Sequence, residues 1–307
     1  MEYDIIGDIH GQAGKLDALL IRLGYVLKAS GWMPPQGKQA IFMGDLIDRG
    51  PEQLKVIRIV RTMIDAGHAR CVMGNHEFNA IGYWTAARDK PDTFLRPHNT
   101  KNESQHVEFL RQLGAGSALH VEMLTWFRSL PPALDLGGLR VVHAWWHQPY
   151  VDLVAKQWPP GSPLGDDFLH SAYVKGSDEW RAMDGLTKGL EVRLPAPHSF
   201  VDHSGVERYE VRTKWWQAEA STYRDVAILA DDQRDRLPEL ALPEDYLGRP
   251  VSGAPVFVGH YWMTGAPKLQ SAKVACVDWS AAKNGPLVAY RWAGEEELDA
   301  SRFVEAG

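Results

Sequence analysis

Three short apolar runs near the start of the chain each end in a glycine that is followed at once by polar side chains. They read YDIIGDIHG from residue 3, QAIFMGDLIDRG from residue 39 and HARCVMGNHE from residue 68. The segments between them carry apolar residues at helical spacing: Leu16, Leu19, Leu20 and Leu23, then Leu54, Ile57, Val60 and Ile64. This alternation of strands and helices predicts a largely parallel, buried sheet with helices on its faces.

The alternation continues to about residue 150 and then breaks. Just before that point, ALDLGGLRVVHAWW reads as a hairpin, whereas the stretch from Pro149 to Pro255 reads mainly as short strands and loops. Three short strands follow in APVFVGHYW, AKVACVDWS and GPLVAYRW. We therefore expect one domain over residues 1–307, interrupted by an insertion at about 150–250.

Charge and cysteine usage narrow the class of protein. Lys and Arg number 33 against 39 Asp and Glu, and the net charge of −6 argues against strong nucleic-acid binding. Cys71 and Cys276 form neither a disulfide framework nor a zinc-finger spacing, which suits a reducing cytoplasm. A strand begins at once, leaving no room for a signal peptide, and no apolar run approaches the roughly 20 residues of a membrane span. We expect a cytoplasmic protein with no membrane partner; the oligomeric state stays open.

Polar side chains recur at the carboxyl ends of five predicted strands, where ligands bind in open α/β sheets. A glycine before most of them lets the chain turn sharply without a Cβ clash. These strand ends supply about the number of donors that two divalent metal ions need when they share one carboxylate: Asp8, His10, Asp45, Asn75, His143 and His260.

The motif set GD-x-HG, GD-x-x-DRG, GNHE, a later strand-end His and a final GH resembles the calcineurin-like metallophosphoesterases. It is most similar to the branch that holds phosphoprotein phosphatases, bacterial diadenosine tetraphosphatases and polynucleotide 2′,3′-phosphatase domains. The close match covers residues 3–80, with weaker anchors near 140–145 and 255–292. The resemblance implies a four-layer α/β/β/α sandwich with an inserted cap-like segment. It also implies a phosphohydrolase that cleaves phosphomonoester or phosphoanhydride bonds by in-line attack of a metal-bridging hydroxide.

The resemblance also assigns roles to individual residues. Asp8 and His10 would hold the first metal ion, Asp45 would bridge both ions, and Asn75, His143 and His260 would complete the second site. His76 would be the general acid, Asp48 the carboxylate that orients it, and Arg49 a guanidinium that binds phosphate. A nearby carboxylate keeps an imidazole charged and correctly turned, and the planar fork of arginine suits phosphate oxygens. Mn²⁺ is the expected ion, and the same ligands would also take Fe or Zn.

Two motifs depart from the family pattern. The fourth reads His143-Ala144-Trp145-Trp146-His147 where the family often has His-Ala-Gly or His-Gly-Gly, and the fifth reads Gly-His-Tyr-Trp where Gly-His-Thr is commoner. The two tryptophans are expected at the rim of the metal site. His147 is an alternative ligand to His143, which we favour because it directly follows an apolar run.

The predicted insertion carries basic residues beside a tryptophan pair, Trp215-Trp216. One reading is a solvated or salt-bridged surface; the other is a cap in which Arg212 and Lys188 contact the outer phosphates of a polyphosphate. The full set is Lys188, Arg193, Arg208, Arg212 and Lys214. The chain holds twelve tryptophans, which indicate either a large aromatic core or a pocket in which rings such as Trp145 stack on a base. Seven further histidines are expected to be solvated: 68, 98, 106, 120, 170, 198 and 203.

The tryptophans and the basic insertion favour a nucleotide-type or other small phosphorylated substrate. A serine/threonine phosphoprotein phosphatase and an RNA-end 2′,3′-phosphatase are the alternatives. A non-catalytic scaffold is a remote one, because no residue of the motif set is lost.

Overall fold

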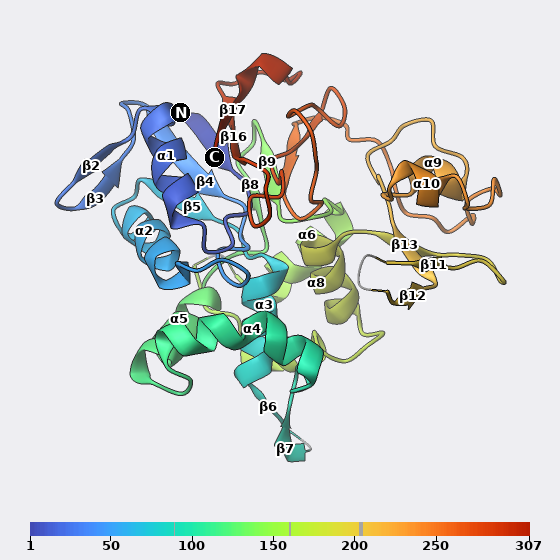
Figure 1. Cartoon of the computed structure of the whole chain (residues 1–307), viewed down its shortest axis with the longest axis horizontal. Coiled ribbons are helices and arrows are strands. Elements are labelled where there is room, and N and C mark those ends of the chain that lie inside the picture. Colours follow the sequence, from blue (N-terminus) through green and yellow to red (C-terminus); the bar gives the residue numbers. More distant parts are fainter. Residues whose placement is uncertain (89, 160, 203–204) are drawn as a thin grey trace. The chain divides into compact units, whose positions relative to one another are not determined.

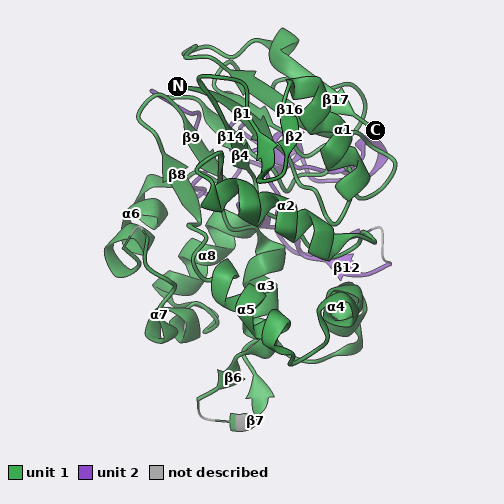
Figure 2. Ribbon diagram, turned by 90° about the vertical axis from the view of Figure 1, so that its left-hand side faces the viewer, with its two compact units in different colours: residues 1–188, 254–307 green, residues 189–253 purple. Residues whose placement is uncertain are grey.

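A computed structural model describes residues 1–88, 90–159, 161–202 and 205–307. The chain divides into two compact units, which are coloured separately in Figure 2. Unit 1 comprises Met1–Lys188 and Ala254–Gly307, and unit 2 comprises Gly189–Gly253. Every residue at which we predict a metal ligand belongs to unit 1.

A five-stranded sheet forms the first layer of strands in unit 1 (Figure 1). Its strands, in spatial order, are β17 (Phe303–Ala306), β16 (Leu287–Trp292), β1 (Glu2–Ile6), β4 (Lys38–Phe42) and β5 (Ala69–Cys71). Strands β1, β4 and β5 run parallel, as the alternation predicts, whereas β16 is antiparallel to both of its neighbours. The sheet is therefore mixed, because the two C-terminal strands return to its free edge as a hairpin. Helices α1 (Ala13–Leu23) and α2 (Gln53–Asp65) pack against this sheet.

A second sheet faces the first across a shared core. Its strands are β15 (Val274–Cys276), β14 (Val256–Val258), β9 (Arg140–Val142) and β8 (Ala133–Asp135), and β8 and β9 form the predicted hairpin. The core joins buried side chains from both sheets, and the rings of Phe257 and Tyr290 lie 5.1 Å apart across it. The mixed α/β fold class with two facing sheets is thus confirmed.

The remaining helices of unit 1 are α3 (Asn75–Trp84), α4 (Thr100–Leu113), α5 (Ala118–Phe127), α6 (Gln148–Gln157), α7 (Asp166–Ser171) and α8 (Asp178–Lys188). Two small hairpins were not predicted: β2 (Val26–Lys28) with β3 (Gly31–Met33), and β6 (Ala86–Ala87) with β7 (Lys90–Phe94). A short 3₁₀ turn, η1 (Ala300–Arg302), precedes β17. Within the described residues, no helix has the length and apolar character that crossing a membrane requires.

The segment after residue 149 corrects one expectation. Residues 148–188 are largely helical and belong to unit 1, because α6 and α8 pack on each other. Short strands begin only in unit 2, which holds β10 (Glu191–Arg193), β11 (Phe200–Val201), β12 (Glu207–Arg208), β13 (Glu210–Arg212), α9 (Tyr223–Val226) and α10 (Asp231–Arg234). Unit 2 has an apolar core of its own around Val192, Val211 and Val226. The expected insertion at about 150–250 stays a prediction.

Candidate metal centre

The predicted donor residues follow the carboxyl ends of β1, β4, β5, β9 and β14. The backbone there takes the left-handed region at several non-glycine residues, with φ of 46° at His10, 48° at Asp45 and 66° at His260. Such residues cost on the order of 1–3 kcal/mol each and cluster at functional sites. The chain therefore bends sharply at these strand ends to present its polar side chains.

Glycines at two of these bends make room for carboxylates. A Cβ on Gly259 would lie 2.1 Å from Oδ1 of Asp8, and a Cβ on Gly74 would lie 2.3 Å from Oδ1 of Asp45. Neither distance is compatible with a side chain. The glycine in each motif thus permits the close approach of a buried carboxylate.

Asp45 lies between two groups of donors. Its Oδ2 is 3.5 Å from Nε2 of His10, and its Oδ1 is 3.4 Å from Nε2 of His143. Within the described residues, two buried sets have ligand atoms within 4.8 Å of one another: His10, Asp45 and His76, and Asp45, His143 and His260. The carboxylate common to both sets is the one predicted to bridge two ions.

Asn75 completes the second set. Its Oδ1 lies 3.2 Å from Nε2 of His143 and 2.8 Å from Nδ1 of His260. His147 belongs to neither set; it precedes α6, and its ring stacks on Trp145. The geometry therefore favours His143 over His147 as a donor.

The hydrogen bonds of the histidines suit metal binding. Nδ1 of His10 lies 2.8 Å from the carbonyl of Ile47, and Nδ1 of His143 lies 2.6 Å from that of Met43. A ring that donates from Nδ1 to a carbonyl carries its lone pair on Nε2, which is the arrangement metal-ligating histidines adopt. In both residues Nε2 is the atom that faces Asp45.

Two buried atoms of the site make no hydrogen bond to any residue that the structure describes: Oδ1 of Asp8 and Nε2 of His10. A buried polar atom without a partner is costly, and a divalent cation would satisfy both. Burial also raises the pKa of Asp8 well above its usual range, and repulsion from Asp278 adds to that effect. The donor set and its electrostatics therefore fit divalent metal ions.

His76 lies beside these donors and is held by Asp48. Nδ1 of His76 is 2.5 Å from Oδ2 of Asp48, while its Nε2 is 3.8 Å from Oδ2 of Asp45. Burial opposes the charged imidazole, but the carboxylates of Asp45 and Asp48 outweigh it, so the pKa of His76 is raised. The exposed Arg49 places Nη2 3.4 Å from Nε2 of His76. An imidazole and a guanidinium thus lie side by side next to these donors.

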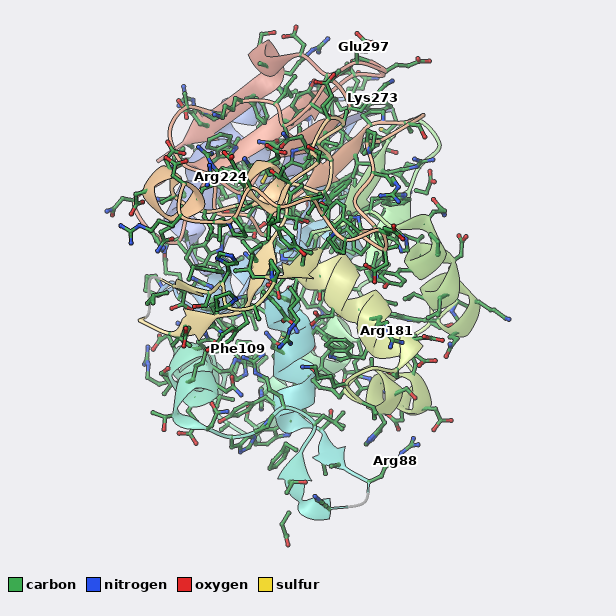
Figure 3. The ribbon with its side chains drawn as sticks, turned by 90° about the vertical axis from the view of Figure 1, so that its right-hand side faces the viewer. Arg88, Phe109, Arg181, Arg224, Lys273 and Glu297 are labelled. Atoms are coloured by element: carbon green, nitrogen blue, oxygen red, sulfur yellow. The ribbon has the colours of Figure 1, made fainter. Side chains whose placement is uncertain are left out.

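Sequence reasoning missed His106, which we expected to be solvated. It is 5% exposed on α4, and its Nδ1 lies 3.0 Å from Oδ1 of Asp48. Burial raises the pKa of Asp48, but the hydrogen bonds from His106 and His76 prevail and hold it below its usual value. The spacing of His106 with Phe109 and Leu113 was the available signal, because these residues form the buried stripe of α4. Figure 3 labels Phe109 on this helix.

His120 is likewise buried, on α5, so the expectation of solvation was wrong for it as well. His203 lies outside the described residues.

Two further carboxylates organise the loops around the site. Asp278 follows β15, so the strand-end signal applied to it too; its oxygens accept hydrogen bonds from the N–H groups of Trp262 and Ser280. Glu77 accepts from the N–H groups of Asp45, Leu46 and Gly74 at 2.8–3.0 Å. Burial, together with Asp45, raises the pKa of Glu77 to about 7. Its contacts support a structural role in tying two motifs together.

The other residues expected near substrate either contact neighbouring side chains or belong to unit 2. Trp145 is 3% exposed and stacks on His147 at 4.5 Å, so base stacking by this ring would require those contacts to change. Lys188 is paired with Asp184, and Arg208 with Asp202, as the salt-bridged reading of the basic set requires. Arg212 lies on β13 in unit 2, and its role stays a prediction.

Most tryptophans belong to the core. Eight of the twelve side chains are buried, including Trp146 at 8% exposure, and the expected position of Trp145 and Trp146 at the rim of the metal site stays a prediction. Trp262 is half-buried.

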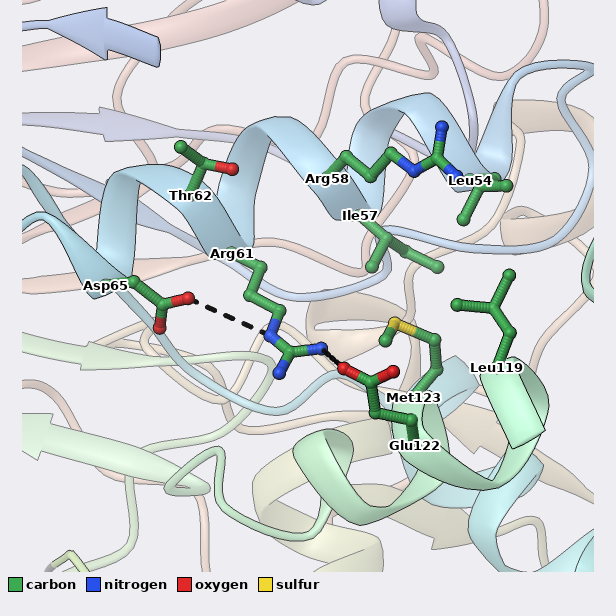
Figure 4. A pocket seen from close by; sticks show the side chains of 9 residues that line it. All are labelled: Leu54, Ile57, Arg58, Arg61, Thr62, Asp65, Leu119, Glu122 and Met123. Atoms are coloured by element: carbon green, nitrogen blue, oxygen red, sulfur yellow. Dashed lines mark hydrogen bonds and ion pairs between the residues drawn. The ribbon is translucent and has the colours of Figure 1, made fainter. Parts of the chain in front are cut away.

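A separate cavity of about 280 Å³ lies between α2 and α5 (Figure 4). Arg61 crosses it and donates to Glu122 at 2.6 Å. None of the predicted site residues lines it; the lining residues are Leu54, Ile57, Arg58, Arg61, Thr62, Asp65, Leu119, Glu122 and Met123.

Comparison with known proteins places these motifs in a family. The sequence model described as calcineurin-like phosphoesterase matches residues 1–193. Among curated proteins, the asymmetrical bis(5′-nucleosyl)-tetraphosphatase PrpE of Halalkalibacterium halodurans is 36% identical over 116 residues, which are 36% of this chain and 47% of that protein. The PrpE of Geobacillus thermodenitrificans is 49% identical over 76 residues, which are 25% of this chain and 31% of that protein. The chain thus spans less than half the length of these relatives.

Among solved structures, a protein serine/threonine phosphatase from Saccharomyces cerevisiae superposes with a TM-score of 0.51 at 15% identity. The match covers 99% of this chain and 78% of that one. At this identity the likeness concerns the fold alone.

Proposed function

Because this chain belongs to the calcineurin-like phosphoesterase family, we propose that it is a dinuclear-metal phosphohydrolase that cleaves phosphoanhydride bonds of a nucleotide. The observation that carries the proposal is the position of Asp45. One oxygen of its carboxylate faces His10 and the other faces His143, so one residue serves two donor sets. A site for a single ion would not need a shared carboxylate between two groups of histidines.

The proposed ligands are Asp8 and His10 for one ion and Asn75, His143 and His260 for the other, with Asp45 common to both. Two divalent ions bound there would acidify water and brace the oxygens of a phosphoryl group. We propose Mn²⁺ as the native ion, since mixed imidazole, carboxylate and amide donors suit it; Fe and Zn fit the same donors.

His76 is the proposed general acid. Its Nδ1 is engaged by Asp48, so Nε2 is the atom left to deliver a proton to the leaving oxygen. Burial disfavours the charged ring, but the carboxylates of Asp45 and Asp48 raise the pKa of His76, which favours the protonated form that an acid needs. Arg49, exposed beside Nε2 of His76, is placed to bind and orient the phosphoryl group through paired N–H donors.

The nucleotide substrate is proposed from the relatives. Proteins named bis(5′-nucleosyl)-tetraphosphatases match part of this chain at 36–49% identity. Their names imply hydrolysis of a dinucleoside polyphosphate, and we carry that substrate class over to this chain. A phosphopeptide and an RNA-end phosphate are the competing substrates.

Phosphate release by Mn²⁺-reconstituted protein tests the proposal, with metal-free protein as the control. The panel comprises p-nitrophenyl phosphate, its bis ester, a phosphopeptide, a 2′,3′-cyclic nucleotide and diadenosine tetraphosphate. We expect the highest kcat/KM with the tetraphosphate. Faster turnover of the phosphopeptide or of the cyclic nucleotide would overturn the substrate class. If the protein binds both ions but releases phosphate from none of these substrates, the result would favour a non-catalytic scaffold.

A further inference from the structure

Two cationic side chains, those of Arg49 and Lys283, lie over the ring of Trp262. Cζ of Arg49 lies 3.8 Å from the centre of the indole, and Nζ of Lys283 lies 4.2 Å from it. Since both lie over one ring, these two atoms are no more than about 8 Å apart. A tryptophan face attracts cations and is the best aromatic surface for doing so. The indole therefore gathers two positive charges into one small region.

The backbone around Trp262 is built to hold this arrangement. Trp262 has a φ of 52°, and its N–H donates to Oδ2 of the buried Asp278 at 2.7 Å. The loop that carries Lys283 begins at the same carboxylate, because Oδ1 of Asp278 accepts from the N–H of Ser280 at 3.0 Å. One buried side chain thus fixes the origin of both loops.

A second anchor holds the far end of the Lys283 loop. The ammonium of Lys15, from α1, donates to the carbonyls of Ala281 and Gly285 at 3.0 and 2.6 Å. A Cβ on Gly285 would lie 1.8 Å from the carbonyl oxygen of Trp279, so the loop closes in a turn that only glycine fits. Lys283 therefore extends from a constrained turn.

Both cations are accessible. Arg49 and Lys283 are exposed, and among the residues that the structure describes Lys283 forms no ion pair with a carboxylate. Arg49 also lies 3.4 Å from His76, so the pair of cations borders the proposed acid. Two cations so close together repel each other, and an anion with more than one phosphate would relieve that repulsion.

We propose that Arg49, Trp262 and Lys283 form a phosphate-chain site that binds a second phosphate of the substrate, beyond the one that reacts. This inference rests on the proposed phosphohydrolase function. It adds a physical reason why the protein would prefer a polyphosphate to a phosphomonoester. Arg49 holds the reacting phosphoryl group, and Lys283 binds its neighbour in the same polyphosphate chain. The ring of Trp262 sets the spacing between the two cations. A phosphomonoester has no second phosphate and gains nothing from Lys283.

The test is the selectivity of Lys283→Gln in the Mn²⁺-loaded protein. We expect the ratio of kcat/KM for diadenosine tetraphosphate to kcat/KM for p-nitrophenyl phosphate to fall about tenfold, a typical loss for one charge-assisted hydrogen bond. Trp262→Leu should lower the same ratio, because Arg49 and Lys283 both lose the aromatic ring over which they lie. The matched control is Lys28→Gln, an exposed lysine on β2, which should leave the ratio within about twofold of wild type.

The outcomes separate this inference from the proposed function. An unchanged ratio in Lys283→Gln, with wild type active on both substrates, overturns the phosphate-chain site and leaves the phosphohydrolase intact. If wild type hydrolyses neither substrate, the phosphate-chain site is tested by calorimetry, which measures the binding of tripolyphosphate and of orthophosphate to wild type and variant. A selective loss of tripolyphosphate binding in Lys283→Gln then supports the site, and equal binding by variant and wild type overturns it.

Discussion

His106 is linked to His76 through Asp48: its Nδ1 lies 3.0 Å from Oδ1 of that carboxylate, whose Oδ2 is 2.5 Å from Nδ1 of His76. The carboxylate is thus held on both sides, and its orientation toward His76 depends on a residue from a different helix. We propose that His106 is a positioning residue, because it acts on His76, the proposed acid, through Asp48.

Replacing His106 should therefore slow catalysis. In His106→Ala we expect kcat to fall roughly tenfold with KM little changed, since a hydrogen bond to a charged group is lost. His106→Asn keeps an N–H donor and should retain more of the rate. Phe109→Leu is the control, because the ring of Phe109 packs on that of His106, so this substitution should lower stability more than kcat. A kcat for His106→Ala equal to that of wild type would refute the positioning role.

Removal of the proposed acid should separate chemistry from metal binding. His76→Ala is expected to lower kcat by roughly 10²–10⁴, the usual contribution of a general acid. Metal content, measured by mass spectrometry of the purified protein, should stay near the wild-type value. The loss should be smaller for a substrate with a good leaving group such as p-nitrophenolate, which needs less protonation. Intact turnover of diadenosine tetraphosphate in this variant would show that the acid is another group.

The glycine before His260 offers a steric test of the site. Gly259→Ala would place a Cβ 2.1 Å from Oδ1 of Asp8, so the carboxylate must move and metal affinity should fall at least tenfold. Gly14→Ala is the matched control, because no atom lies within 4 Å of its added Cβ. Isothermal titration with Mn²⁺ measures both variants. Equal affinity in Gly259→Ala and wild type would contradict the placement of Asp8 as a ligand.

Acid should destabilise the fold through His120. This histidine is fully buried, and its Nδ1 accepts from the N–H of Gly116 at 3.1 Å. Burial lowers its pKa to about 4, and His106 adds to that effect. The unfolded chain binds the proton at the ordinary pKa of about 6.5, so it takes up more protons between these two values. Stability from this residue is complete above about pH 6.5 and is lost as the pH falls toward 4.

The size of this effect can be measured against a variant. His120→Asn keeps an acceptor near the Gly116 N–H and removes the titration. Between about pH 7.5 and 5.5, wild type should lose about 1 kcal/mol more of its unfolding free energy than the variant. Urea denaturation at both pH values provides the comparison. Equal losses would mean that His120 titrates normally in the folded protein.

Much of the sandwich and of the site could be predicted because most of the strand ends combine an apolar run, a glycine and a donor in continuous sequence. Asp8, Asp45 and Asn75 need no knowledge of distant contacts to be recognised. His106 was missed because its partner, Asp48, is far along the chain, and a histidine on a helix is usually solvated. Asp278 carried the same strand-end signal but lacked a neighbouring glycine motif to single it out.

The platform at Trp262 could not be predicted either. It depends on three loops, two of which are held by the buried Asp278, and no local pattern encodes their approach to one another. The mixed sheet has a similar cause, since the direction of β16 follows from its pairing with β1 and not from its own apolar pattern.

The most direct test of the shared-carboxylate centre is a crystal structure of the Mn²⁺-loaded protein with anomalous scattering collected at the manganese edge. The shared-carboxylate centre predicts two peaks roughly 3.5–4 Å apart, one on each side of Asp45, with His10 beside one and His143 beside the other. A single peak, or two peaks that do not share Asp45, would contradict it.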